Sequence, residues 1–211
     1  IHASIYDVFL KRLVEITEGL RVGHPETPNV HMGSLINQKH MESVHRYVEL
    51  AKAEGGTVVT GGEAITEGEF AKGSFYKPTI ITGLKNSAQT CQEEIFGPIL
   101  PILTFDNYEE LYSLFANKPK PLALYIFSED KKRVDETINR CSFGGGCIND
   151  TIMQIAINSF GFGGVGESGM GSYHGKAGFK AFSHEKSIHK KVTWFDFPVR
   201  YNPHNNKLFN F

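Results

Sequence analysis

A first candidate for chemistry in this sequence is a glycine-dense segment, residues 160–178. Within it, Gly164 to Gly169 satisfies G-x-G-x-x-G, the spacing of loops that hold dinucleotide phosphates. Such a loop joins a strand to a helix in a βαβ unit that has an acidic residue about 20 positions further on. The sequence after Gly169 is too short for another unit of that kind, and so many glycines make chance matches common. A tight structural or pocket-lining loop is therefore favoured over a dinucleotide site.

Two adjacent carboxylates, Glu93 and Glu94, form a second candidate, an acid/base pair. If they lie on a strand, neighbouring side chains point to opposite faces and cannot both serve one site. From the residues alone we expect a solvated pair.

The cysteine thiols and histidine imidazoles are weaker candidates for a catalytic or metal site. None of Cys91, Cys141 and Cys147 has a neighbouring His or Lys, or a clear helix start, to stabilise a thiolate. The odd number of cysteines also argues against a disulfide framework. The nine histidines form no H-E-x-x-H motif and the cysteines no paired spacing, so we expect no metal site.

Hydrophobic spacing predicts the elements that must position these residues. Ser4 would cap a first helix, with Asp7 as capping-box partner, and Gly19 would end it. A second helix should begin near Asn37 and end at Gly55. Its predicted apolar stripe is Met41, Val44, Val48 and Ala51, followed by a short strand at 57–60.

From about residue 98 onward, strands and helices alternate. Strands are predicted at 99–105, 122–127 and 146–149, with helices at 107–117 and 128–140. This alternation is typical of βαβ units, so we predict an α/β fold with a parallel sheet. A late strand, Lys186–Phe195, follows the finished sheet and needs a partner edge, which we expect from another subunit.

Composition excludes several classes of function. The chain has 211 residues, 40% hydrophobic, and a formal net charge of -1, which favours neither nucleic acid nor an anionic membrane. No apolar run approaches the roughly 18 residues of a membrane helix, and the N-terminal residues do not form a signal peptide. The cysteine usage fits a reducing compartment, so we expect a cytoplasmic protein.

Four segments together resemble the aldehyde dehydrogenase superfamily. They are Gln92–Pro98 (QEEIFGP), Pro121–Ser128 (PLALYIFS), Gly145–Asp150 (GGCIND) and Phe162–Lys176 (FGGVGESGMGSYHGK), in the family's order and spacing. The last segment, the Phe182–His184 triplet and the Arg200–Pro203 tail are most similar to the class 3 branch, which handles fatty and aromatic aldehydes.

The resemblance implies a role for six residues. At the Glu94 position the family's carboxylate bonds the nicotinamide ribose hydroxyls of NAD or NADP, and Phe96 packs against the same ribose and nicotinamide. Phe162 matches a wall of the aldehyde pocket. The positions that line the pocket mouth in class 3 are Ile155, Ala156 and His174.

The same resemblance divides the chain into a catalytic domain, residues 1–183, and an oligomerisation arm, residues 184–211. The arm's strand, Lys186–Phe195, would build a homodimer or tetramer. A departure is Gly161, which stands where the family usually has proline and loosens the pocket loop. Residues 20–36 look more like other branches, which leaves the substrate class open.

The family oxidises an aldehyde to a carboxylic acid through a cysteine thioester. Its G-Q-x-C nucleophile segment, general-base Glu, oxyanion-hole Asn and Rossmann-like domain are absent from these 211 residues. We therefore expect this chain alone to be inactive. The alternatives are a stand-alone binding or assembly domain, and recruitment of Cys91, Cys141 or Cys147 as nucleophile.

Overall fold

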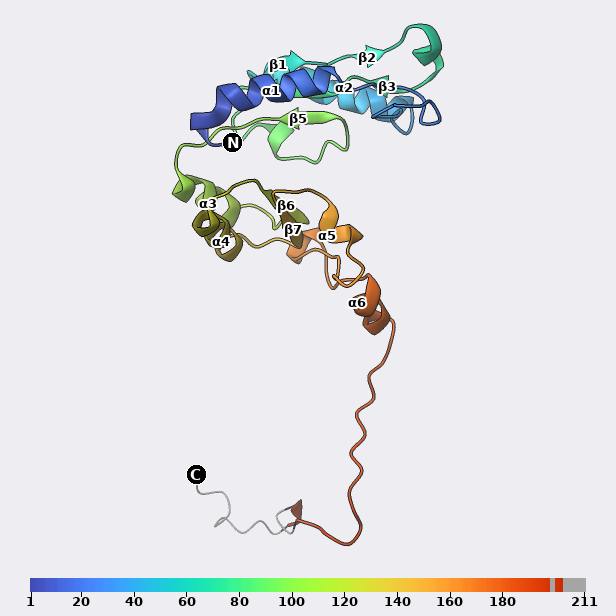
Figure 1. The fold of residues 1–211 in the computed structure, drawn as a ribbon, viewed down its shortest axis with the longest axis vertical. Helices are drawn as coiled ribbons and strands as arrows, with labels where there is room; N and C mark the ends of the chain where they lie inside the picture. The colour runs from blue at the N-terminus through green and yellow to red at the C-terminus, as the bar shows by residue number, and fades with distance from the viewer. Residues whose placement is uncertain (198–199, 203–211) are drawn as a thin grey trace. The chain divides into compact units, whose positions relative to one another are not determined.

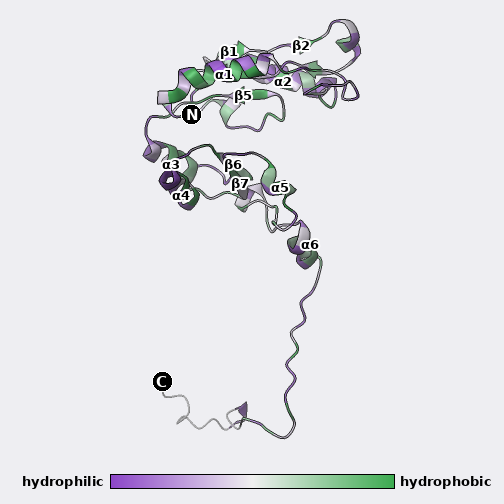
Figure 2. Ribbon diagram, viewed as in Figure 1, coloured by the Kyte–Doolittle hydropathy of each residue, from purple (hydrophilic) through white to green (hydrophobic). Residues whose placement is uncertain are grey.

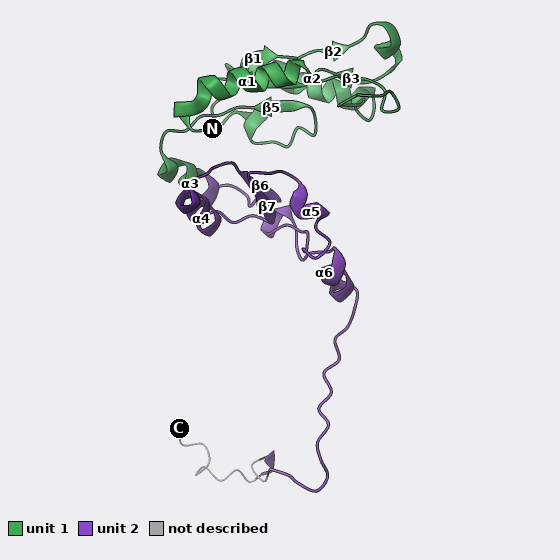
Figure 3. Cartoon of the chain, in the orientation of Figure 1, with its two compact units in different colours: residues 1–114 green, residues 115–211 purple. Residues whose placement is uncertain are grey.

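The structure, a computed structural model, describes residues 1–197 and 200–202 (Figure 1). The part of the predicted arm at 198–199 and 203–211, with Pro203 of the tail match, lies outside the described residues. The chain divides into two compact units, residues 1–114 and 115–211 (Figure 3). No helix in the described part of the chain has the length and apolar character needed to span a membrane.

The first unit is built from two long helices and short strands. Its elements are α1 (Tyr6–Glu18), α2 (Gln38–Ala53), β1 (Thr57–Thr60), β2 (Ala64–Ile65), β3 (Phe75–Tyr76), β4 (Thr79–Thr82) and β5 (Ile99–Pro101), with 3₁₀ turns at Ala3–Ile5, Gly68–Lys72 and Gln89–Cys91. Helix α3 (Tyr108–Ala116) lies mostly in the first unit, which ends at Leu114. The second unit holds the end of α3, then β6 (Ala123–Ile126), α4 (Lys131–Arg140), β7 (Gly145–Ile148), α5 (Met153–Ala156), a 3₁₀ turn at Gly166–Ser168 and α6 (Gly175–Ala181).

The predicted parallel sheet is correct only in part. β6 and β7 are parallel, and so are β4 and β5, but β1 runs antiparallel to β4 in the order β1-β4-β5. The difference comes from the β2-β3 hairpin, which returns the chain from β1 to β4 without a helical crossover. The fold is thus α/β with mixed pairing.

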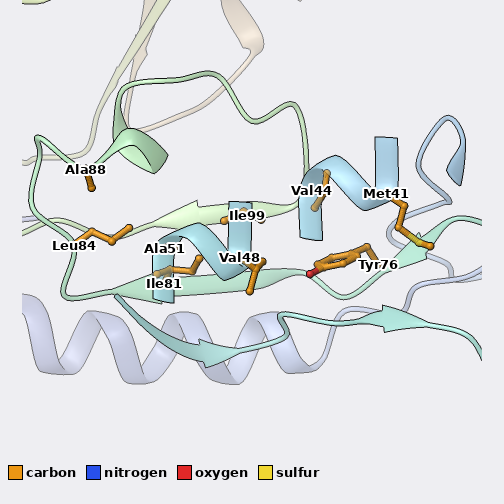
Figure 4. Packing of buried hydrophobic residues seen from close by; sticks show 9 residues of the cluster. All are labelled: Met41, Val44, Val48, Ala51, Tyr76, Ile81, Leu84, Ala88 and Ile99. Atoms are coloured by element: carbon orange, nitrogen blue, oxygen red, sulfur yellow. The ribbon is translucent and has the colours of Figure 1, made fainter. Parts of the chain in front are cut away.

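Helix α2 is the predicted element that the structure reproduces most fully. The Asn37 side chain caps it by accepting a hydrogen bond from the His40 amide at 2.9 Å. All four residues of its predicted stripe are buried. Figure 4 shows them packed on the sheet with Tyr76, Ile81, Leu84, Ala88 and Ile99. Each large aliphatic side chain buried there stabilises the unit by about 1.5–3 kcal/mol.

The predicted caps of two other helices are wrong. The Ser4 amide donates to the His2 imidazole within the first 3₁₀ turn, so α1 starts later and its N-cap, Ile5, has no side-chain cap. Ser128 accepts from the Asp130 amide instead of capping α4, and Asp130 is the N-cap. Figure 2 shows hydrophobic and hydrophilic residues alternating along α1, none of which is buried.

Tyr76 makes the stability of the first unit depend on pH. Its side chain is fully buried and its hydroxyl bonds His45 Nδ1 at 2.9 Å. Burial, together with the charges of Glu49 and Glu63, raises the pKa of Tyr76 to about 12. The unfolded chain therefore ionises first, and the stabilisation is present below pH 10 and lost as the pH rises towards 12.

The variant Tyr76→Phe tests this coupling. We expect it to lower the free energy of unfolding by about 1 kcal/mol at neutral pH, because the His45 bond is lost. We also expect the decline of stability between pH 10 and 12 to become shallower. Urea unfolding across this pH range measures both effects, and an unchanged slope would contradict the assignment to Tyr76.

Candidate functional site

The Gln92–Pro98 segment forms an irregular turn that is fixed to α2. Phe96 holds a left-handed φ of 56°, and its side chain is 76% exposed. A non-glycine residue in this conformation is uncommon and is kept there by its surroundings. His40 Nε2 lies 2.7 Å from the Phe96 carbonyl oxygen, and Gly97 comes so close to Val44 that an added Cβ would lie 2.5 Å from its Cγ2. The turn therefore presents an exposed aromatic ring from a fixed backbone.

The two adjacent glutamates of this turn have different environments. Glu93 accepts hydrogen bonds from Tyr47 Oη at 2.6 Å and from Gln89 Nε2 at 2.8 Å. The Tyr47 bond is the main reason why the pKa of Glu93 is lowered, and the same bond raises the pKa of Tyr47. Glu94 is exposed, and within the described residues its carboxylate has no hydrogen bond or ion pair. Both glutamates are exposed to solvent, as expected, but the segment is not a strand and Glu93 is also bonded to Tyr47 and Gln89.

The opposite end of α2 supports the preceding turn. Glu54 accepts hydrogen bonds from the Gln89 amide at 2.6 Å and from Thr90 Oγ1 at 2.7 Å. The Thr90 hydroxyl contributes most to the lowered pKa of Glu54. Sequence reasoning did not identify Tyr47, Glu54 or His40, because their partners stand more than 30 positions away in the chain.

The second unit positions Ile155 and Ala156 on α5, directly after β7. This helix is four residues long and follows Ile152, whose φ of 67° is a strained value for a β-branched residue. Ile155 is half-buried and Ala156 is exposed. Gln154, which precedes them in α5, is buried.

The glycine-dense segment folds back on itself and brings two predicted pocket residues together. The Phe162 amide donates to the Tyr173 carbonyl at 2.8 Å, and the Tyr173 amide donates back at 2.9 Å. The ring centroids of Phe162 and His174 are 6.0 Å apart, and the Tyr173 ring lies at 4.8 Å from His174. The Val165 amide donates to Ser168 Oγ at 2.9 Å, inside the G-x-G-x-x-G match. This closed loop supports the structural interpretation of the glycines.

A cavity of about 380 Å³ lies beside this loop. Its lining consists of Gly144, Gly145, Gly146, Gln154, Ser159, Phe160, Gly161, Phe162 and Gly163. The volume falls in the range of about 300–1,000 Å³ that is typical of small-molecule sites. Of the four predicted pocket residues, only Phe162 lines the cavity, and Gln154, Ser159 and Phe160 were not predicted. No charged side chain contributes to the lining, which suits an uncharged ligand group.

The cysteines offer little support for a nucleophile. Cys141 is buried, and burial raises the pKa of its thiol although Arg140 opposes this. Cys147 donates its thiol hydrogen to Gln154 Oε1 at 2.9 Å. Across residues 1–197 and 200–202, no group of three His, Cys, Asp or Glu side chains is arranged to hold a metal ion.

Comparison with known proteins gives a consistent result. Residues 1–188 match the model of the aldehyde dehydrogenase family. A 4,4'-diaponeurosporen-aldehyde dehydrogenase from Staphylococcus aureus is 42% identical over 83% of this chain and 37% of its own length. Aldehyde dehydrogenase family 3 member H1 from Arabidopsis thaliana is 38% identical over 82% of this chain and 35% of its own length.

A solved structure gives the same picture. Betaine aldehyde dehydrogenase from Staphylococcus aureus, in complex with NAD+, superposes with a TM-score of 0.79 at 29% identity. The match covers 93% of this chain and 40% of that one. This chain thus spans little more than a third of the length of each of these two curated relatives.

Proposed function

This chain belongs to the aldehyde dehydrogenase family, and we propose that it forms the cofactor clamp and part of the aldehyde pocket of an NAD(P)-dependent enzyme. The complete enzyme would oxidise an aldehyde to a carboxylic acid. The observation that carries the proposal is the Glu94–Phe96 turn, which combines a carboxylate without a partner among the described residues and an exposed ring on a fixed backbone.

These residues fit a nicotinamide ribose. A carboxylate accepts two hydrogen bonds at once, and a diol donates two, so Glu94 can hold both ribose hydroxyls. The exposed ring of Phe96 offers an apolar surface for the ribose and nicotinamide. Glu93 and His40 hold the turn, so the clamp is ordered before a ligand arrives and less conformational freedom is lost on binding. NAD or NADP would supply the hydride acceptor, and the sequence leaves the choice between them open.

The second unit supports a role in aldehyde binding. Phe162 contributes an apolar wall to a cavity without charged side chains, and the His174 ring lies beside it, tilted by 39°. We assign Ile155 and Ala156 to the same pocket, since α5 precedes the segment that lines the cavity. The class 3 match in residues 162–176 favours a fatty or aromatic aldehyde.

We expect this chain alone to form no product. The reaction needs a thiolate, a general base and an oxyanion donor, and the buried or bonded thiols described here are poorly suited to the first role. We also assign residues 1–183 to the catalytic domain and keep the cytoplasm as the expected location.

A stand-alone assembly domain is the second candidate, and one observation favours it. Residues 186–192 form no strand within this chain, and Ile188 and Trp194 are 79% and 83% exposed. Such a segment suits pairing with the sheet of a second copy, in a homodimer or tetramer. Sedimentation of the chain with and without residues 184–211 tests this role independently of any catalysis.

Turnover with two proteins tests the main proposal. The first is this 211-residue chain, and the second joins it to an upstream segment that carries G-Q-x-C, where the gene encodes one. With an aldehyde and NAD+ or NADP+, we expect NAD(P)H absorbance to rise only with the second. Turnover by the chain alone would instead implicate one of its three cysteines, which alkylation would then abolish. No turnover by either protein would favour the assembly domain.

A further inference from the structure

Gln154 occupies an unusual place in the second unit. It is 8% exposed, and it is the one buried side chain with an amide among the residues that the structure describes. Its Oε1 accepts from Cys147 Sγ at 2.9 Å and its Nε2 donates to Tyr125 Oη at 3.1 Å. Both ends of the amide are therefore used, and a buried amide left without these partners would be costly.

The two partners stand opposite each other on neighbouring strands. Tyr125 of β6 is the register partner of Cys147 of β7 in the parallel pair. Directly opposed residues project to the same face of a sheet, so one amide can bridge both strands. Gln154 packs over Gly145, where an added Cβ would lie 3.6 Å from Gln154 Cγ, an ordinary contact distance.

Helix α5 has little else to hold it. A helix of four residues is one turn, and such a turn has no independent stability. Gln154 is its only buried residue, and the preceding Ile152 is held at a strained φ of 67°. The residues that α5 carries next are Ile155 and Ala156, and Gln154 itself contributes to the cavity wall.

We propose that Gln154 is a positioning residue for aldehyde binding, which holds α5 against Tyr125 and Cys147 and thereby fixes the pocket wall. This inference rests on the proposed function. In this role Gln154 acts through Ile155, Ala156 and the shape of the cavity, and not through contact with the reacting atoms.

Thiol alkylation of the 211-residue chain tests the bridge without any need for catalysis. In Gln154→Met, which keeps the side-chain length and removes both bonds, we expect Cys147 to react roughly five- to tenfold faster with iodoacetamide. The buried Cys141 should keep its rate, since it reports unfolding of the same unit. Peptide mass spectrometry reads both thiols in one sample, and Met153→Leu on the exposed side of α5 is the matched control.

Tyr125→Phe separates a bridge from simple masking of the thiol. It leaves the acceptor of Cys147 in place and removes the bond on the other strand. A bridge that positions α5 predicts faster alkylation of Cys147 in this variant as well. An unchanged Cys147 rate in either variant, or equal acceleration of Cys141 and Cys147, would overturn the inference.

The complete enzyme gives the functional readout. We expect Gln154→Met to raise the KM for the aldehyde by roughly fivefold or more, with a smaller change in kcat. For Gln154→Glu, the aldehyde KM of the variant is divided by that of the unsubstituted enzyme at each pH. This ratio should fall as the pH is lowered, because a protonated carboxyl restores one donor and one acceptor. Equal losses of kcat in both variants, independent of pH, would contradict positioning. An unsubstituted enzyme without turnover would refute the proposed function and leave the alkylation result intact.

Discussion

The Glu94→Ala variant of the complete enzyme should raise the KM for NAD(P) by roughly ten- to a hundredfold, which corresponds to one or two lost hydrogen bonds to a charged group. The Glu94 carboxylate has no hydrogen bond or ion pair within the described residues, so its removal frees no buried partner. The melting temperature should therefore change little. Initial rates at varied NAD(P) and saturating aldehyde measure the first effect, and calorimetry measures the second.

Glu93→Ala is the matched control for this prediction. It removes the neighbouring carboxylate, which bonds Tyr47 and Gln89, so its main effect should be on stability. Glu94→Gln, which keeps one acceptor, should give an intermediate KM. If Glu93→Ala raised the cofactor KM more than Glu94→Ala did, the two roles assigned to these glutamates would be reversed.

Helix α2 shows how much of the fold is encoded locally. Its cap at Asn37 and its apolar stripe are contained within one helix, where a 3.6-residue period and a capping side chain are visible in the sequence. The same holds for the β6-α4-β7 alternation. Such elements are predictable because the neighbours that stabilise them are a few positions away.

The central strand β4 shows why other elements were not predicted. Its four residues are all buried, so they show no alternation of apolar and polar side chains. The β2 and β3 strands have only two residues each, too short for a period. Without these strands the sequence suggested a purely parallel sheet, and the antiparallel pairing of β1 was missed.

The candidate site was proposed from motifs, and its geometry could not be read from the sequence. The Glu94 and Phe96 positions came from a motif, whereas the left-handed φ of Phe96 depends on His40 and on the close approach of Gly97 to Val44. Gln154 is a single polar residue in an apolar stretch, residues 152–157, and its hydrogen bonds join it to residues 7 and 29 positions away.

The second large effect is expected from Gly163→Ala, which should lower the free energy of unfolding of the second unit by about 2–5 kcal/mol. An added Cβ would lie 2.1 Å from the Gly171 carbonyl oxygen and 3.0 Å from Ser172 Cα. Both are backbone atoms and cannot rotate away. The loop must open, and the paired bonds between Phe162 and Tyr173 are the first contacts to be lost. Because Phe162 lines the cavity, the proposed aldehyde pocket should be disturbed as well.

Gly171→Ala separates this clash from the cost of backbone conformation. Gly171 has a φ of 70° and no atom within 4 Å of an added Cβ, so only the left-handed conformation is penalised, by about 1–2 kcal/mol. Urea unfolding should therefore give Gly163→Ala a clearly lower free energy of unfolding than Gly171→Ala. Hydrogen exchange should show faster exchange of the Phe162 and Tyr173 amides in Gly163→Ala and slow exchange in Gly171→Ala. Equal stability of the two variants, with both amides protected, would mean that the loop tolerates a side chain at Gly163 and that close packing does not define this wall of the pocket.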